Sequence, residues 1–333
     1  MDSGCGHGNV FIMHVEDDRI SSLPDDVIHK ILSFVGLKHA VQASVLSSRW
    51  KYIWTSLPYL NFLGEDFSTE RMFSKFVEHF ITRHNNLLKV SSVKLTFYGP
   101  FNQVFVKRIM NYAFTHNAQQ MTVRRLDWFT DDLPVSLFSS QSLKSLSLRQ
   151  LKPAPTWDLP FLTTLYLDYV IFDVNEGISH ISKCANLKNL TLHSCWVRES
   201  YYETVGCFDI HLPELCNLTL KDGGCFEMGL NVFAPQLENL TVIDWEQVHL
   251  QSIPTLVSLV FKGRYNGLLQ ISSFDLCFLE KVDRLCIYKS YNKKDKIDDD
   301  HNLVALLRQI QNAKRITLNL DLIQVCHYVN IDL

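Results

Sequence analysis

The sequence lacks the features that mark several large classes of protein. No window approaches the run of about 18 apolar residues that a membrane-spanning helix needs. The formal net charge of -3 gives no basic surplus of the kind that nucleic-acid-binding proteins concentrate on one face. The nine cysteines include no CxxC pair, and the first residues do not show the basic and then apolar pattern of a secretory signal. We therefore expect no membrane span, no nucleic-acid partner, free thiols, and a reducing location in the cytoplasm, the nucleus or both.

The sequence is instead rich in one repeated apolar phrase. Hydrophobic residues make up 47% of the 333-residue chain and charged residues 20%, which is typical of an ordered protein. The strong copies of the phrase are "LKSLSL" (143–148), "LTTLYL" (162–167), "LKNLTL" (187–192), "LCNLTL" (215–220), "LENLTV" (237–242) and "LVSLVF" (256–261). Their starts are 19, 25, 28, 22 and 19 residues apart. These steps fall around the 20–29-residue period of leucine-rich repeats.

The spacing within the phrase predicts a β-strand in each repeat. The last two apolar residues lie two positions apart, so on a strand both point to one face. A single repeat cannot bury them, and the repeats must therefore stack into a solenoid. The residue that follows each phrase points to the opposite face, on the inner curve of the solenoid. We predict that the following such residues contact a bound protein: Arg149, Asp168, His193, Lys221, Lys262 and Tyr288.

A separate apolar segment, "SSLPDDVIHKILSFV" (21–35), precedes the repeats. Pro24 suits the first position of a helix, and the two following aspartates suit the positive end of its dipole. The residues with helical spacing on its apolar face are Val27, Ile28, Ile31, Leu32 and Val35. We expect two more short helices, one around 39–46 and one that begins near 47 or 48. Three short helices cannot hide all of these apolar side chains, and the surplus predicts a surface for another protein.

The ordered motifs of residues 17–62 resemble a plant-type F-box. They are "LP" at 23–24, an apolar helix, an alanine-containing helix, "SSRW" at 47–50 and a further tryptophan at 54. The segment "FVGLKHAVQ" (34–42) departs from the family, which more often has a Thr-Lys-Asp-Ala-like link there. The repeats in turn resemble the irregular leucine-rich repeats of plant F-box proteins.

The resemblance implies docking on the Skp adaptor of a cullin–RING ubiquitin ligase. The residues that match the motif, and are therefore predicted adaptor contacts, are Leu23, Pro24, Ile28, Ile31, Leu32, Val41 and Val45. Trp50 and Trp54 are expected to hold the F-box helices together or to meet the following segment. The alternative is that all of these side chains merely pack against the solenoid.

The predicted fold is an α+β repeat protein in which a small three-helix F-box precedes an irregular leucine-rich-repeat solenoid, with a curved parallel sheet inside and helices and loops outside. We expect a flexible N-terminus at 1–16, the F-box at 17–62 and the repeat array at 63–333. Its first repeats, at 63–120, should be atypical and helical. The array stops soon after a repeat phrase, so we expect an open C-terminal flank that reflects a truncation, a short isoform or a missing partner.

The predicted function is a non-catalytic substrate-recognition subunit of an SCF (Skp–cullin–F-box) ubiquitin ligase whose repeats bind a protein target. The alternative is a scaffold, or a truncated competitor, that binds the adaptor or a partner without promoting ubiquitination. The sequence does not decide whether a small molecule assists binding of the target.

One pair of residues near the middle of the repeats has a spacing that two metal ligands could share. His193 and Cys195 are two positions apart, but no second pair follows at a zinc-site spacing. No nucleophile, base and orienting group can be placed together from the sequence. We therefore predict no metal, no cofactor and no enzymatic activity.

Overall fold

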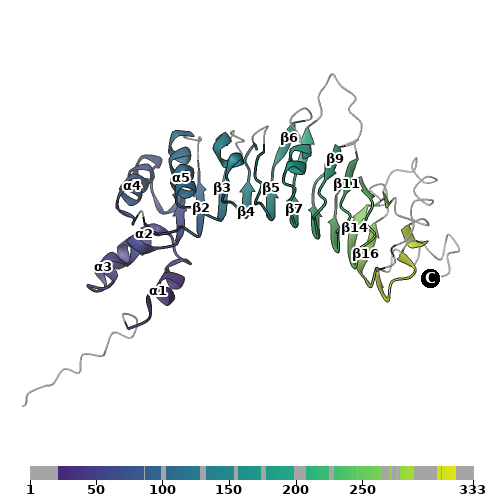
Figure 1. Cartoon of the computed structure of the whole chain (residues 1–333), viewed down its shortest axis with the longest axis horizontal. Coiled ribbons are helices and arrows are strands. Elements are labelled where there is room, and N and C mark those ends of the chain that lie inside the picture. Colours follow the sequence, from purple (N-terminus) through teal and green to yellow (C-terminus); the bar gives the residue numbers. More distant parts are fainter. Residues whose placement is uncertain are drawn as a thin grey trace, which may run out of the picture.

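The fold is dominated by one parallel sheet whose strands follow one another in chain order (Figure 1). The computed structural model describes residues 22–85, 87–98, 103–127, 133–153, 157–173, 178–198, 208–224, 229–245, 247–264, 270–271, 276, 278–288, 306–308 and 310–319. The eleven strands are β1 (Tyr59–Leu63), β2 (Ser92–Phe97), β3 (Gln120–Arg125), β4 (Ser145–Arg149), β5 (Thr164–Asp168), β7 (Asn189–His193), β10 (Asn217–Lys221), β12 (Asn239–Ile243), β14 (Ser258–Arg264), β16 (Lys281–Tyr288) and β17 (Arg315–Leu318). The predicted fold, an N-terminal helical region followed by a parallel repeat sheet, is confirmed.

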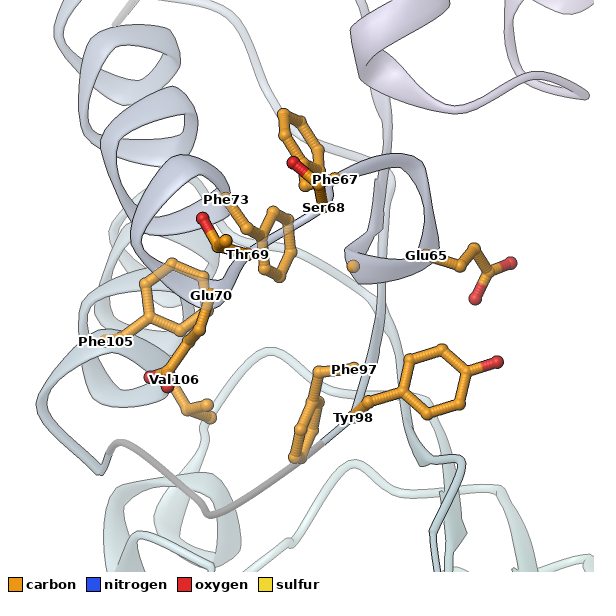
Figure 2. A pocket seen from close by; sticks show the side chains of 11 residues that line it. Glu65, Phe67, Ser68, Thr69, Glu70, Phe73, Phe97, Tyr98, Phe105 and Val106 are labelled. Carbon is orange, nitrogen blue, oxygen red and sulfur yellow. The ribbon is translucent and has the colours of Figure 1, made fainter.

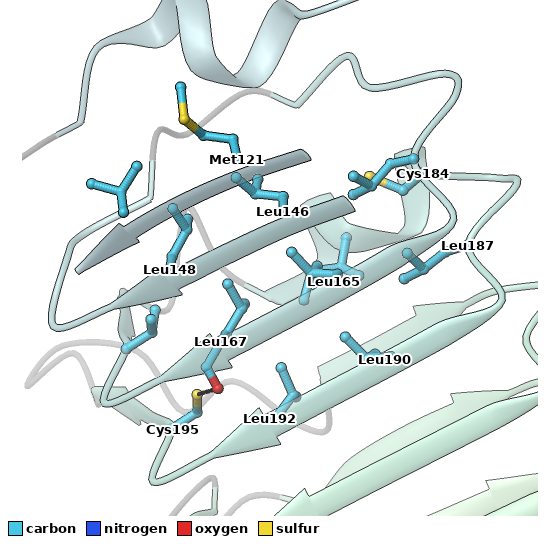
Figure 3. Close-up of a cluster of buried hydrophobic side chains, with 14 of the residues drawn as sticks. Met121, Leu146, Leu148, Leu165, Leu167, Cys184, Leu187, Leu190, Leu192 and Cys195 are labelled. Atoms are coloured by element: carbon cyan, nitrogen blue, oxygen red, sulfur yellow. Dashed lines mark hydrogen bonds between the residues drawn. The ribbon is translucent and has the colours of Figure 1, made fainter. Parts of the chain in front are cut away.

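Each strong phrase forms a strand that starts at its third residue. Leu146 lies opposite Leu165, which lies opposite Leu190, and the same register continues through the later phrases. Alternate residues of β4, β7 and β10 are buried and half-buried, as the period of two predicts. The buried leucines stack from strand to strand in one hydrophobic cluster (Figure 3). A repeat therefore gains its core from its neighbours.

The chain leaves five successive strands through the same turn. The residue after each strand has a positive φ between 47° and 55°, and the five are Gln150, Tyr169, Ser194, Asp222 and Asp244. The backbone N–H of each donates to a carbonyl of the next repeat at 2.6–2.9 Å. None of the five is glycine, although a positive φ costs an L-residue energy. These hydrogen bonds between repeats hold the left-handed turns in place.

The outer side of the solenoid differs between its two ends. The first repeats carry α4 (Glu70–Arg83) and α5 (Gln103–Thr115), and the next ones carry the 3₁₀ segments η4 (Val135–Ser139) and η6 (Ile178–Lys183). Short strands also occur outside the main sheet. They are the pair β6 (Ile171–Asp173) and β8 (Trp196–Arg198) on either side of η6, and a second parallel sheet of β9 (Phe208–His211), β11 (Leu230–Phe233), β13 (Val248–Gln251) and β15 (Gln270–Ile271) in the later repeats. Segments such as "LNVF" and "VHLQ" alternate between apolar and polar residues and pack their apolar side into the core. The expected outer helices are thus replaced by strands in these repeats.

The N-terminal helices lie beyond the β1 edge of the sheet (Figure 1). They are α1 (Asp25–Leu32), α2 (Leu37–Gln42) with the 3₁₀ turn η1 (Ala43–Val45), and α3 (Trp50–Ile53) with η2 (Trp54–Ser56); η3 (Gly64–Asp66) follows β1. Pro24 is the N-cap of α1 and not its first helical residue, and its carbonyl accepts from the N–H groups of Val27 and Ile28. A proline fits this position because its missing N–H is not needed there.

A buried histidine joins the N-terminal helices to the first repeats. His84, at the end of α4, is 2% exposed. Its Nε2–H donates to the carbonyl oxygen of Leu57 at 2.9 Å, and its Nδ1 accepts from the Tyr112 hydroxyl of α5 at 2.5 Å. Burial lowers the pKa of His84 and raises the pKa of Tyr112 to about 12. These hydrogen bonds connect the segment before β1 to the end of α4 and to α5.

Two predictions concern parts of the chain outside the described residues. They are the flexible N-terminus at 1–16 and the open flank that was expected at the C-terminal end, beyond residue 319.

Candidate functional site

The seven predicted adaptor contacts divide by burial into three groups. Ile28 is 0% exposed and Leu32 is 5% exposed, so both belong to the chain's own core and cannot reach a partner as the helices stand. Leu23 and Val41 are half-buried against that core. Pro24 is exposed, and Ile31 and Val45 are 43% and 86% exposed.

Several exposed apolar side chains of the same helices were not among the predicted contacts. They are Val27, Phe34, Val35, Leu46 and Tyr52, and Phe34 is 75% exposed. Together with Pro24, Ile31 and Val45 they form what we call the F-box apolar surface. Val27, Ile31, Phe34 and Val35 follow one another at steps of four, three and one, so helical spacing was a signal for this face. On the same helices, Arg49 forms an ion pair with Asp25 and lowers the pKa of the Asp25 carboxyl group.

The two tryptophans of the motif have different surroundings. Trp50 is 3% exposed and lies within the core of the short helices. Trp54 is half-buried, and its ring centroid lies 5.6 Å from that of Phe80 in α4. The indole N–H of Trp54 donates to the carbonyl of Lys51 at 3.1 Å. One tryptophan therefore packs the helices together, and the other contacts the segment that follows.

The predicted inner-face residues lie side by side on adjacent strands, with one exception. Arg149, Asp168, His193 and Lys221 are opposite one another in register, and Ile243 separates Lys221 from Lys262. Tyr288 is out of line, because the register between β14 and β16 shifts after Leu259 and places Tyr288 opposite Arg264. Cys286 is the residue opposite Lys262. A bulge of this kind is not visible in an apolar pattern.

An ionic network lies at the centre of this row. Asp168, whose side chain is 8% exposed, accepts from His193 Nδ1 at 2.8 Å and lies 3.5 Å from Arg149 Nε. Asp222 faces the other ring nitrogen of His193, at 3.3 Å. The Arg149 guanidinium lies over the Tyr169 ring, 5.5 Å from its centroid. Asp222 and Tyr169 were not predicted, because they occupy the turns after the strands.

The same geometry separates the two candidate metal ligands. His193 lies on the inner face, whereas Cys195 is 1% exposed and its thiol contacts the carbonyl of Leu167. Burial raises the pKa of Cys195 to about 12, which disfavours the thiolate that binds metals. Within the described part of the chain, no three histidine, cysteine or acidic side chains gather as metal ligands.

A row of amides lies at the opposite end of the same strands from the ionic network. Asn239 donates to the Oδ1 of Asn217 at 2.7 Å, Asn217 donates to Asn189 at 2.7 Å, and Asn189 donates to the Thr164 hydroxyl at 3.2 Å. The four residues start adjacent strands, so this ladder runs across the sheet along the inner face. The inner face is therefore polar and uncharged where these strands begin, and charged where they end.

One pocket of about 430 Å³ lies between the first turns of α4, α5 and the end of β2 (Figure 2). Aromatic rings line it, and the centroid of the Phe73 ring lies 5.2 Å from that of Phe67 and 5.1 Å from that of Phe105. The polar lining includes Thr69, which caps α4 by accepting from the N–H of Met72 at 3.2 Å. Its described lining holds no histidine or cysteine to serve as a base or nucleophile.

No helix in the described ranges is long and apolar enough to span a bilayer. Comparison with known proteins matches residues 20–62 to the F-box domain family. A putative F-box/FBD/LRR-repeat protein of Arabidopsis thaliana is 30% identical over 239 residues, which cover 69% of this chain and 54% of the relative.

This chain matches a larger share of two further relatives from Arabidopsis thaliana. An F-box/FBD/LRR-repeat protein is 29% identical over 334 residues, covering 93% of this chain and 65% of the relative. An F-box/LRR-repeat protein is 30% identical over 251 residues, covering 71% of this chain and 67% of the relative. The chain thus spans about half to two thirds of the length of the curated relatives that it matches. With its short N-terminal helices and its parallel repeat sheet, the chain belongs to the plant F-box/LRR-repeat protein family.

Proposed function

We propose that this chain is the substrate-recognition subunit of an SCF-type ubiquitin ligase. Its F-box docks on a Skp-type adaptor, and through it on the cullin and the RING protein, while the repeats hold a protein target. F-box/LRR proteins are generally non-catalytic adaptors, so the chain raises the local concentration of target lysines beside a ubiquitin thioester formed elsewhere.

The F-box apolar surface is the observation that carries the proposal. Val45 is 86% exposed, Phe34 75% and Leu46 65%, and all three lie on or beside the short helices of the F-box. Large exposed apolar side chains that occur together in one short helical segment mark a site for another protein. The buried Ile28 and Leu32 have a different role, since they hold α1 against the rest of the chain.

The inner face of the sheet is the proposed target site. It combines the charged row with the amide ladder, so it offers both ion pairs and hydrogen-bond groups to a bound protein. Arg149, Asp168, His193, Lys221 and Lys262 stay the predicted contacts, and Tyr288 stays a prediction at a shifted position.

Adaptor binding can be tested with a matched pair of double variants. Phe34→Ser/Val45→Ser removes two exposed apolar side chains from the F-box, and Leu87→Ser/Val104→Ser removes two that are 93% and 73% exposed elsewhere. Burial of two such side chains in an interface is worth about 3 kcal/mol, or about 100-fold in affinity. We expect that loss for the F-box variant alone, measured by titration with a purified Skp-type adaptor. Equal binding by all three proteins, or no binding by the unaltered chain, would contradict the proposal.

A reconstituted ligase separates this proposal from the scaffold or competitor alternative. With the chain assembled on adaptor, cullin and RING protein, a co-purified binding partner should become ubiquitinated, and the Phe34→Ser/Val45→Ser variant should not support the reaction. Binding of both adaptor and partner without modification of the partner would favour the scaffold.

A further inference from the structure

Two arginines stand directly opposite each other on the inner face, at the end of the sheet nearest to the F-box. The register of β3 and β4 pairs Arg124 with Arg149, and adjacent strands lie about 4.8 Å apart. Like charges in this position destabilise a sheet. Both residues are half-buried, and the Arg149 side chain is 39% exposed.

Lys94 and the hydroxyl of Tyr166 lie on the same inner face as the two arginines. Lys94 of β2 lies on the same face, two residues before Thr96, which is opposite Arg124. Tyr166 of β5 lies near both arginines: burial and Asp168 raise the pKa of its hydroxyl, and the two guanidinium groups oppose that increase. We call Lys94, Arg124 and Arg149 the basic triad.

The triad is only partly neutralised by the chain itself. Asp168 contacts Arg149 on its Nε side, and that carboxylate is shared with His193. Among the described residues, Arg124 and Lys94 have no ion pair. Tyr169 covers one face of the Arg149 guanidinium, and this contact orients the group. The result is a fixed excess of positive charge in a half-buried surface, where screening by solvent is weaker.

We propose that the basic triad binds a phosphorylated serine or threonine side chain of the target protein. This inference rests on the proposed function, because it names the chemistry of the target that the inner face holds. A phosphomonoester carries a charge of about −1.5 to −2 and three acceptor oxygens, so one group can neutralise two facing guanidinium groups. Arginine forks also bind phosphate through pairs of parallel hydrogen bonds.

The charge pattern beyond the triad favours a single anionic group over a polyanion. In the repeats that follow, Asp168 on β5 and Asp222 and Asp244 in the turns after β10 and β12 lie among the cations, and Lys262 is paired with Asp244 at 3.4 Å. A nucleic acid would have to cross these carboxylates, whereas a peptide could place its phosphate on the triad and its backbone along the amide ladder.

The probe is a degenerate peptide library with a central phosphoserine or phosphothreonine, compared with libraries that have serine or glutamate at that position. The full-length chain is immobilised, and retention of each library is quantified. We expect the phosphorylated library to be retained at least about ten-fold more than the serine library. Arg124→Gln/Arg149→Gln should abolish this preference. Lys144→Gln/Lys188→Gln, which removes two exposed lysines from the turns before β4 and β7, should leave it unchanged.

The single variant Arg124→Gln keeps the test valid if the double variant does not fold. Because it removes the facing like charge, it should unfold at the same temperature as the unaltered chain or higher, and still lose most of the preference. No preference for phosphate, a preference that survives Arg124→Gln, or equal retention of the glutamate library would overturn the proposal. Adaptor binding by the same preparations should be unaffected, so a failure here is distinguishable from a failure of the proposed ligase function.

Discussion

Replacement of His84 by phenylalanine should destabilise the junction between the F-box and the repeats. The imidazole is the hydrogen-bond partner of both the Leu57 carbonyl and the Tyr112 hydroxyl, at 2.9 and 2.5 Å. Each buried polar group left without a partner costs about 1–3 kcal/mol, so the two groups that His84→Phe leaves unpaired should lower the free energy of unfolding by about 2–6 kcal/mol. Urea-induced unfolding measures this value.

The double variant His84→Phe/Tyr112→Phe provides the internal control. It removes the orphaned hydroxyl and leaves only the Leu57 carbonyl without a partner, so it should be more stable than His84→Phe alone. A neutral cost for His84→Phe, or losses that add in the double variant, would refute the hydrogen-bonded arrangement.

The same histidine predicts a pH dependence with a definite sign. Burial lowers the folded-state pKa of His84 below its usual value of 6.5, so near and below pH 6.5 the unfolded chain binds more protons than the folded chain. The stability that neutral His84 contributes is present above that value and is lost as the pH falls through the lower folded-state pKa. The stability difference between the unaltered chain and His84→Phe should therefore be smaller at about pH 5.5 than at about pH 7.5. A difference that is constant or that grows on acidification would contradict this.

Three further predictions test the repeats. Leu218 is 2% exposed, so Leu218→Ala should lower the free energy of unfolding of the chain by about 2–5 kcal/mol. Thr219 lies on the half-buried inner face, so Thr219→Ala should change that free energy by less than about 1 kcal/mol. Equal effects of the two substitutions would mean that the two faces of β10 are misassigned. A Cβ at Gly223 would lie 2.3 Å from the Cys195 carbonyl oxygen, so Gly223→Ala should lower the thermal midpoint, and an unchanged midpoint would exclude this close approach. Because burial raises the pKa of Cys195 to about 12, its thiol should resist iodoacetamide until the chain unfolds; mass spectrometry of native protein that shows rapid alkylation would disprove its burial.

The repeat sheet was predictable from the sequence because its register follows from local spacing. Two apolar residues at positions two apart must share a face of a strand, and stacking equivalent phrases places Leu146, Leu165 and Leu190 opposite one another. The inner-face row up to Lys262 followed from the same rule. The prediction failed at Tyr288, where a register shift interrupts the period.

The helical segment shows the limit of such patterns. Ile28 and Ile31 are both apolar residues of one short helix, yet the first is 0% exposed and the second 43%. A helix with one broad apolar face does not reveal which part of that face meets its own chain. That choice depends on where the rest of the F-box and β1 pack.

The sequence by itself therefore determined the stacked parallel strands, the short N-terminal helices and the face on which Arg149, Asp168 and His193 meet. Only the tertiary structure decided which F-box side chains stay in solvent, that Arg124 faces Arg149, and that His84 joins Leu57 to Tyr112 across 27 and 28 residues of chain. The physical reason is the distance along the chain over which each property is set. Alternation along a strand is a local steric property. Burial and hydrogen bonding of a side chain depend on groups that folding brings together from distant parts of the chain.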